Sequence, residues 1–189
     1  MGVPESQSYT RAKKSLYTQA MRSVIRTILL LTTCSALSLV AQAQDTTQPP
    51  PNQHPILTVT GKGVQIYTCQ QAPTGSQWVF QAPEAILTDS SGTPVGTHGA
   101  GPIWKSKDGS TVKGDVLQKS ASPDPAAIPW LLLKATTSSG SGIMSHVEYI
   151  RRSETHGGIA PTTACDAGHL NASARVPYTA TYTFYSAKP

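Results

Sequence analysis

The sequence predicts an all-β fold, a single and mainly antiparallel β-barrel or β-sandwich domain. Turn-forming residues recur at short intervals, and the segments between them are rich in Val, Ile, Thr, Tyr and Trp. Apolar and polar residues alternate over 176–185, the period of a strand with one buried face. After residue 44 no window long enough for a helix shows a helical stripe. Turns are expected at 61–63, 73–75, 89–92, 107–109, 138–142 and 156–158.

The first 43 residues predict a route out of the cytoplasm. From Met21 the chain has a basic start, an apolar run over 27–40 and the small-x-small sequence Ala41-Gln42-Ala43, the three parts of a secretory signal peptide. We expect a signal peptide at 21–43, cleavage after Ala43 and a secreted or periplasmic product. The apolar run is shorter than the roughly 20 residues that a membrane anchor needs. Residues 1–20 are either a long basic extension or the result of an upstream misassigned start.

The remaining chain divides into a linker and one β domain. Residues 44–55 are rich in Pro, Gln and Thr, which favours an extended linker without its own core. The β domain is expected over 56–189. The apolar run at 130–133 fits a strand covered on both faces or a short buried turn. Strands are expected where β-branched and aromatic residues stand between turn signals, at 56–60, 64–69, 77–81, 85–88, 103–105, 111–117, 130–136, 143–152 and 176–185.

Cysteine usage predicts one disulfide. Cys34 lies in the leader and lacks the small preceding residue of a lipid-attachment site, so soluble export is expected. Cys69 and Cys165 remain as an even pair in an exported chain, for which a disulfide is the default expectation. The alternative is a catalytic pair of a cysteine and a histidine.

Composition and missing motifs exclude several functions. Of the formal charge of +5, residues 1–43 carry +4, so the remainder is nearly neutral and a nucleic-acid partner is not expected. No membrane span is expected after signal removal. The motifs of nucleophile-elbow hydrolases, zinc proteases, P-loop proteins and dinucleotide enzymes are absent, and no cofactor is expected. Asn171-Ala172-Ser173 is a glycosylation sequon, which matters only in a eukaryotic secretory pathway.

The candidate site residues cluster around a glycine-rich stretch at 95–104. His98, Trp104 and Asp108 could line a pocket with an apolar wall and two titratable groups. The structural alternative, which the sequence favours, is a tight loop, a core tryptophan and a turn aspartate. A metal site is not predicted, because no two histidines have the spacing that places them on one strand face. The residues from which a metal site could be built are His98, His156, His169 and Asp166.

An ordered set of motifs resembles a known family, the secreted domain of unknown function catalogued as DUF3455, found in bacteria and fungi. The resemblance covers about residues 56–186, and it implies no activity and no catalytic residues. His98, Trp104 and Asp108 fall within its most recognisable motif. The motifs that carry the resemblance are Gly63–Cys69, Trp78, Ala85–Leu87, Val95–His98, Gly101–Trp104, Asp108–Ser110, Ile128–Leu133, Tyr149–Arg152, Thr155, Gly157-Gly158, Ala160-Pro161, Cys165 and Val176–Ala180.

A second similarity is to periplasmic C-type lysozyme inhibitors, small exported β-barrels with a Tyr-x-Cys motif and a late cysteine. Tyr67-Thr68-Cys69 matches that motif, and Tyr67 is therefore a further binding candidate. Three hypotheses follow, in order of preference. The protein binds a small molecule, an envelope component or an extracellular protein without catalysis. It inhibits an extracellular enzyme such as lysozyme. Or it is an enzyme that uses His98 and Asp108, with or without a metal.

Overall fold

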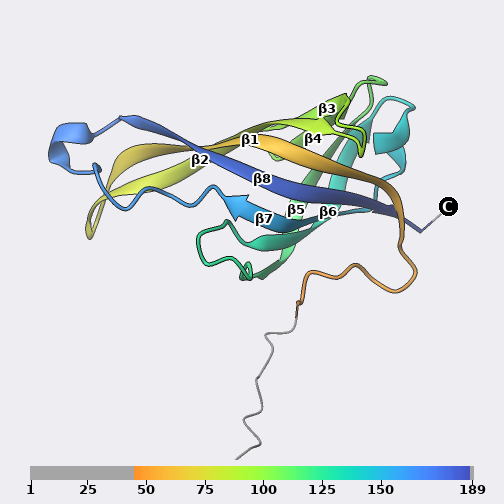
Figure 1. Cartoon of the computed structure of the whole chain (residues 1–189), viewed down its shortest axis with the longest axis horizontal. Coiled ribbons are helices and arrows are strands. Elements are labelled where there is room, and N and C mark those ends of the chain that lie inside the picture. Colours follow the sequence, from red (N-terminus) through yellow and green to blue (C-terminus); the bar gives the residue numbers. More distant parts are fainter. Residues whose placement is uncertain (1–44, 188–189) are drawn as a thin grey trace, which may run out of the picture. The chain divides into compact units, whose positions relative to one another are not determined.

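Eight antiparallel strands form a closed barrel in the computed structural model, which describes residues 45–187. Each strand pairs with its neighbours in sequence, and the last strand pairs with the first, so the ring closes (Figure 1). The expected signal peptide and its cleavage site lie outside the described residues. The all-β prediction is confirmed, and of its two forms the chain adopts the barrel. The strands are β1 (His54–Ala72), β2 (Gly75–Thr88), β3 (Pro94–Gly99), β4 (Ile103–Ser106), β5 (Thr111–Ser120), β6 (Trp130–Ser139), β7 (Tyr149–Gly157) and β8 (Ser173–Ser186).

β1 passes straight through the turn that was expected at 61–63, so that prediction is wrong. Both glycines are strand residues where other parts of the chain come very close. A Cβ on Gly61 would lie 2.5 Å from the Tyr182 ring, and one on Gly63 would overlap the backbone of Glu84 and Ala85. The glycines therefore serve close packing between strands and not a change of direction.

β2 likewise joins two expected strands into one, across Pro83. Among the described residues, β2 pairs with β3 only from Ala85 onward, so the half that contains Pro83 is a sheet edge on that side. Proline is tolerated at such an edge because the missing N–H leaves no ladder bond unmade. β3 was not expected, since its Gly96 and Gly99 made the stretch look like a loop.

The segment expected as one strand over 143–152 is divided. Ile143–His146 form a short 3₁₀ turn, η1, and strand β7 begins only at Tyr149. The turn is held by side chains of the β4–β5 connection, because Ile143 N–H donates to Asp108 and Met144 N–H donates to Ser110 Oγ. Met144 is buried, so η1 closes one end of the core.

The barrel interior is filled mainly by residues that alternate along the strands. β8 confirms the expected alternation, with Tyr178, Ala180, Tyr182 and Phe184 buried. The core also contains Val59, Ala85, Leu87, Trp104, Val112, Ile128, Leu133, Met144, Val147 and Ile150.

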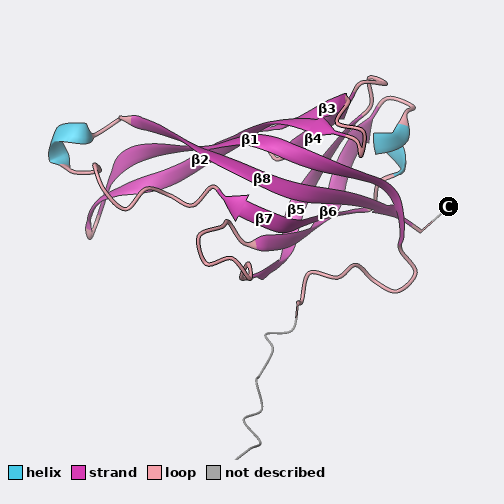
Figure 2. Ribbon diagram, in the orientation of Figure 1, coloured by secondary structure: helices cyan, strands magenta, loops and turns pink. Residues whose placement is uncertain are grey.

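β1, β2 and β8 extend together beyond the rest of the barrel, and the predicted disulfide lies in this extension (Figure 1). Cys69 on β1 is bonded to Cys165 in the loop before β8, which confirms the pairing. A second 3₁₀ turn, η2 (Ala167–His169), follows Cys165, at the opposite end of the barrel from η1 (Figure 2). No helix within residues 45–187 is long and apolar enough to cross a membrane.

The segment before β1, which was expected as a linker, contacts the barrel. Asp45 accepts a hydrogen bond from Arg151 at 2.6 Å, and Thr47 is fully buried. Gln53 donates to the Glu148 carboxylate at 2.8 Å.

Candidate functional site: a cavity inside the barrel

The barrel wall has an opening between one edge of β2 and one edge of β5. β3 and β4 are short, so β2 lacks a partner on that side over 75–84, and β5 is paired only with β6 beyond Lys113, within the part of the chain that the structure describes. The β3–β4 turn at Gly101 and Pro102 bounds the opening. We call this opening the side portal.

A cavity of about 280 Å³ lies behind the side portal. This volume is close to the lower end of the range for small-molecule sites, and an eight-stranded barrel is of the size that can enclose one small ligand. Most of the lining is apolar or aromatic, and the polar groups that converge on it are few. The lining residues are Phe80, Gln81, Pro83, His98, Gly101, Pro102, Trp104, Val116, Leu131, Leu133, Arg152 and Tyr182.

His98 is placed in the wall of this cavity by β3, where it pairs across the sheet with Ala85 and Trp104. Its ring stacks on Trp104 with centroids 4.3 Å apart, and its Nδ1 lies 3.0 Å from the Ile103 carbonyl oxygen. Because a carbonyl only accepts, Nδ1 carries the proton and donates. Burial lowers the pKa of His98 to about 4, and the positive charge of Arg152 acts in the same direction. The imidazole is therefore neutral at physiological pH.

Trp104 is 1% exposed, and its ring packs edge-on against the rings of Tyr182 and Phe184. Its indole N–H is buried and has no hydrogen-bond partner among the described residues. A buried donor without a partner costs free energy, so most such groups are satisfied by protein, water or a ligand. This donor belongs to a residue that lines the cavity.

Arg152 and Tyr182 face each other across the β7–β8 ladder and add two polar groups to the lining. Arg152 donates through Nε and Nη2 to the Pro129 carbonyl, at 3.1 and 2.8 Å. The Tyr182 hydroxyl is 3.1 Å from that of Tyr178. Burial raises the pKa of Tyr182 well above its usual value, so the phenol stays neutral.

Asp108, the third member of the predicted pocket, does not line this cavity. It lies in the β4–β5 turn, where Oδ1 accepts from the N–H and hydroxyl of Ser110 and Oδ2 accepts from Ile143 N–H at 2.9 Å. These hydrogen bonds, chiefly that from the Ser110 hydroxyl, lower the pKa of Asp108 to about 2. His98 and Trp104 are thus brought together, and Asp108 holds a turn.

Tyr67 is adjacent to the cavity without lining it. Its ring meets Phe80 edge-on at 5.7 Å, and Phe80 is part of the side portal. The Tyr67 hydroxyl donates to the Gly158 carbonyl at 2.6 Å. This hydroxyl is therefore committed to a link between β1 and the chain after β7.

The residues considered for a metal site do not converge. His169 bonds to Asp166 at 2.8 Å in the loop after the disulfide, whereas His156 lies 3.6 Å from Asp124. His98 is inside the barrel. Over residues 45–187 no group of three or more His, Cys, Asp or Glu side chains is arranged to hold a metal ion.

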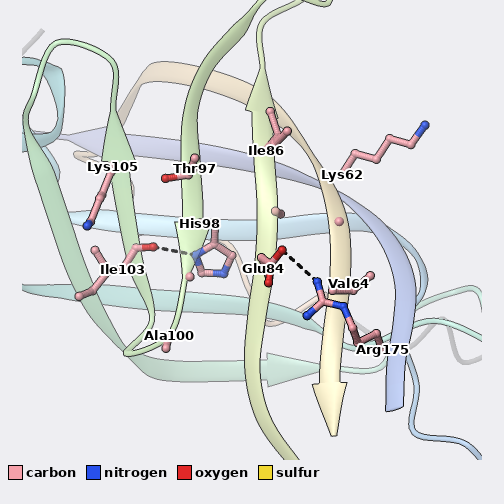
Figure 3. A pocket seen from close by; sticks show the side chains of 13 residues that line it. Lys62, Val64, Glu84, Ile86, Thr97, His98, Ala100, Ile103, Lys105 and Arg175 are labelled. Atoms are coloured by element: carbon pink, nitrogen blue, oxygen red, sulfur yellow. Dashed lines mark hydrogen bonds and ion pairs between the residues drawn. The ribbon is translucent and has the colours of Figure 1, made fainter. Parts of the chain in front are cut away.

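A larger depression of about 590 Å³ lies beside this region, across β1 to β4 (Figure 3). Its charged side chains are Lys62, Lys105 and the ion pair of Arg175 with Glu84, at 2.9 Å. The two members of that pair are 52% and 65% exposed, so the pair contributes little binding or folding energy. The depression contains no buried polar group without a partner among the described residues, and the interior cavity is the better candidate.

Arg152 and Tyr182 are not among the site residues that the sequence predicts. Tyr182 was expected only on the buried face of the last strand. A signal for Arg152 was present, since Ile150 is apolar and an inward face at 150 places residue 152 on the same face. A cation at an inward strand position is uncommon and marks a candidate binding group.

The fold and the cavity define a class, small disulfide-closed β-barrels with an interior cavity that opens through the barrel wall. The chain belongs to the family described as "Protein of unknown function (DUF3455)", whose model matches residues 49–186. No curated protein and no solved structure matches the chain. The family carries no established activity.

Proposed function

We propose that this protein is an exported, non-catalytic binding protein that holds a small, mainly apolar molecule in the barrel cavity. The observation that carries the proposal is the cavity behind the side portal, with apolar walls and few polar groups. Binding sites for small molecules have this composition, because apolar walls supply affinity and a few polar groups set orientation.

Exposed apolar side chains at the side portal support the same proposal. Phe80 and Val116 both line the cavity, yet they are 48% and 56% exposed. A ligand that enters between β2 and β5 would cover them, which is favourable at about 25 cal/mol for each Å² of apolar surface. Export is supported by the disulfide, since such bonds persist in oxidising compartments.

The enzyme hypothesis finds no support in the geometry of its two residues. His98 is buried against Trp104 and Tyr182, whereas Asp108 is engaged by Ser110 and Ile143 in a turn. The lysozyme-inhibitor hypothesis stays a prediction.

The proposal is tested with 1-naphthylamine, a small neutral dye whose emission shifts to shorter wavelength in apolar surroundings and whose size suits the cavity. We expect saturable binding by the purified protein. Val116→Trp places a larger side chain in the side portal and should weaken dye binding by about fivefold or more, which corresponds to about 1 kcal/mol.

The matched control is Leu117→Trp. Leu117 is the next residue of β5, is 51% exposed and does not line the cavity, so this variant should bind the dye like the parent protein. Equal dye affinities for the two variants, or no saturable binding by the parent protein, would contradict the proposal.

A further inference from the structure

Arg152 differs from the other arginines of the described chain in lacking an acidic partner. Arg151 is paired with Asp45 at 2.6 Å, and Arg175 with Glu84 at 2.9 Å. Within residues 45–187 no carboxylate lies within 4.0 Å of the Arg152 guanidinium. Two of its N–H groups converge on one neutral carbonyl, that of Pro129, which satisfies hydrogen bonds but not charge.

Arg152 is also the single charged residue among those that line the cavity. His98 is neutral at physiological pH, because burial lowers its pKa to about 4, and Tyr182 remains a neutral phenol. The other lining residues carry no titratable group. A partly buried cation in apolar surroundings is unfavourable unless an anion or several hydrogen bonds compensate it.

Trp104, which lines the same cavity, carries a further donor. Its indole N–H can only donate, and it is buried without a partner among the described residues. Neither Arg152 nor Trp104 can accept a hydrogen bond. The neutral His98 ring can still accept a hydrogen bond at Nε2, whereas Arg152 can only donate, and its positive charge requires an acceptor that is negatively charged.

We infer that the ligand of the barrel cavity is a small apolar carboxylate, whose anionic end binds Arg152 while its apolar part occupies the space between Phe80, Val116 and Leu131. The inference rests on the proposed function and adds the chemical class of the ligand. At about 30 Å³ for each water-sized group, the cavity volume holds roughly nine groups, the size of a medium-chain fatty acid or a small aromatic acid.

The experiment compares ligands of equal chain length in displacing the bound dye. Octanoate and 1-octanol share an apolar chain and differ in charge, and acetate carries the charge without the chain. Octanoate should displace the dye at a concentration about tenfold lower than octanol, and acetate should not displace it. In Arg152→Gln the preference for octanoate over octanol should disappear.

The matched control variant is Arg151→Gln, which removes the neighbouring cation that is already paired with Asp45. It should keep the preference for octanoate. Arg152→Lys keeps the charge without the planar fork, and should restore part of the preference.

The outcomes separate the inference from the function on which it rests. If the parent protein binds the dye but octanol competes as well as octanoate, the inference is wrong and the proposed function stands. If the dye does not bind, both fail. If Arg152→Gln does not fold, the comparison of octanoate, octanol and acetate on the parent protein, together with Arg152→Lys, still decides.

Discussion

At the scale of single residues, His98 is buried and Asp108 is exposed, although they are only ten positions apart. His98 is inside the barrel and stacks on Trp104, so its charged form is disfavoured. Asp108 is on the surface, where three donors stabilise its charged form. Each group therefore links the stability of the protein to pH, in separate ranges.

His98 should make the protein less stable as pH falls from about 6.5 to about 4. Burial lowers the pKa of His98 in the folded protein below its ordinary value of 6.5. Its contribution to the unfolding free energy is therefore complete above pH 6.5. The contribution is lost at lower pH, where His98 binds a proton in the unfolded chain but not in the folded one. His98→Phe keeps an aromatic ring and removes the titration. Between pH 7 and 4.5 the parent protein should lose about 2 kcal/mol more unfolding free energy than the variant. Urea unfolding at both pH values measures the difference, and parallel losses would contradict the burial of a neutral imidazole.

Asp108 should matter for folding and not for binding. Asp108→Asn removes the negative charge that accepts from Ser110 and Ile143, so the melting temperature at pH 7 should fall. The difference from the parent should shrink as pH falls toward 2, because the folded pKa of Asp108 is about 2 and its contribution is present only while it is ionised. Dye affinity should not change. A large loss of dye binding in a fully folded variant would show that Asp108 takes part in binding, contrary to this prediction.

At the scale of elements, strand packing depends on close approach between backbones. β1 pairs with β2 at Gly63, where the absence of a side chain lets the backbone of Glu84 and Ala85 come close. The disulfide acts on the same strand near its C-terminal end, where Cys69 is joined to the loop before β8.

Gly63→Ala should destabilise the protein by about 1 to 3 kcal/mol, the usual range for overpacking. The added methyl group would overlap the Glu84 carbonyl oxygen and lie 2.6 Å from the Ala85 Cα. Gly99→Ala is the control, because no heavy atom lies within 4 Å of its added Cβ. Chemical unfolding compares the two variants. Equal stabilities would show that β1 and β2 do not approach so closely.

Removal of the disulfide should lower the unfolding free energy by up to about 4 to 5 kcal/mol, since the bond closes a long loop in the unfolded chain. Cys69 and Cys165 are separated by 96 positions. The double variant Cys69→Ala with Cys165→Ala is compared with the parent by urea unfolding. The exported parent should also weigh about two daltons less than its dithiol form, and two free thiols on that protein would refute the bond.

At the scale of the whole molecule, the β class, the disulfide and the alternation of β8 were predictable because each depends on local pattern or on compartment. The unbroken course of β1 through 61–63 was not predictable, because glycine is typical both of turns and of strand positions that another part of the chain approaches closely. Only the positions of Tyr182 and Glu84 show that the second reason applies at Gly61 and Gly63. The cavity was half predictable. His98 and Trp104 are neighbours because they pair within one short hairpin. Arg152 lies on β7, on the far side of the ring, and its approach to them depends on the pairing of β7 with β8, which the local sequence does not reveal.

The most direct measurement of the central claim, that the barrel interior is a binding cavity, is the indole N–H signal of each tryptophan in a proton–nitrogen NMR spectrum during titration with octanoate. Trp104 lines the cavity, Trp78 bonds to the Thr163 carbonyl, and Trp130 does not line the cavity. The signal of Trp104 should move in a saturable way while those of Trp78 and Trp130 stay in place. An unmoved Trp104 signal at saturating octanoate and at saturating dye would contradict the account.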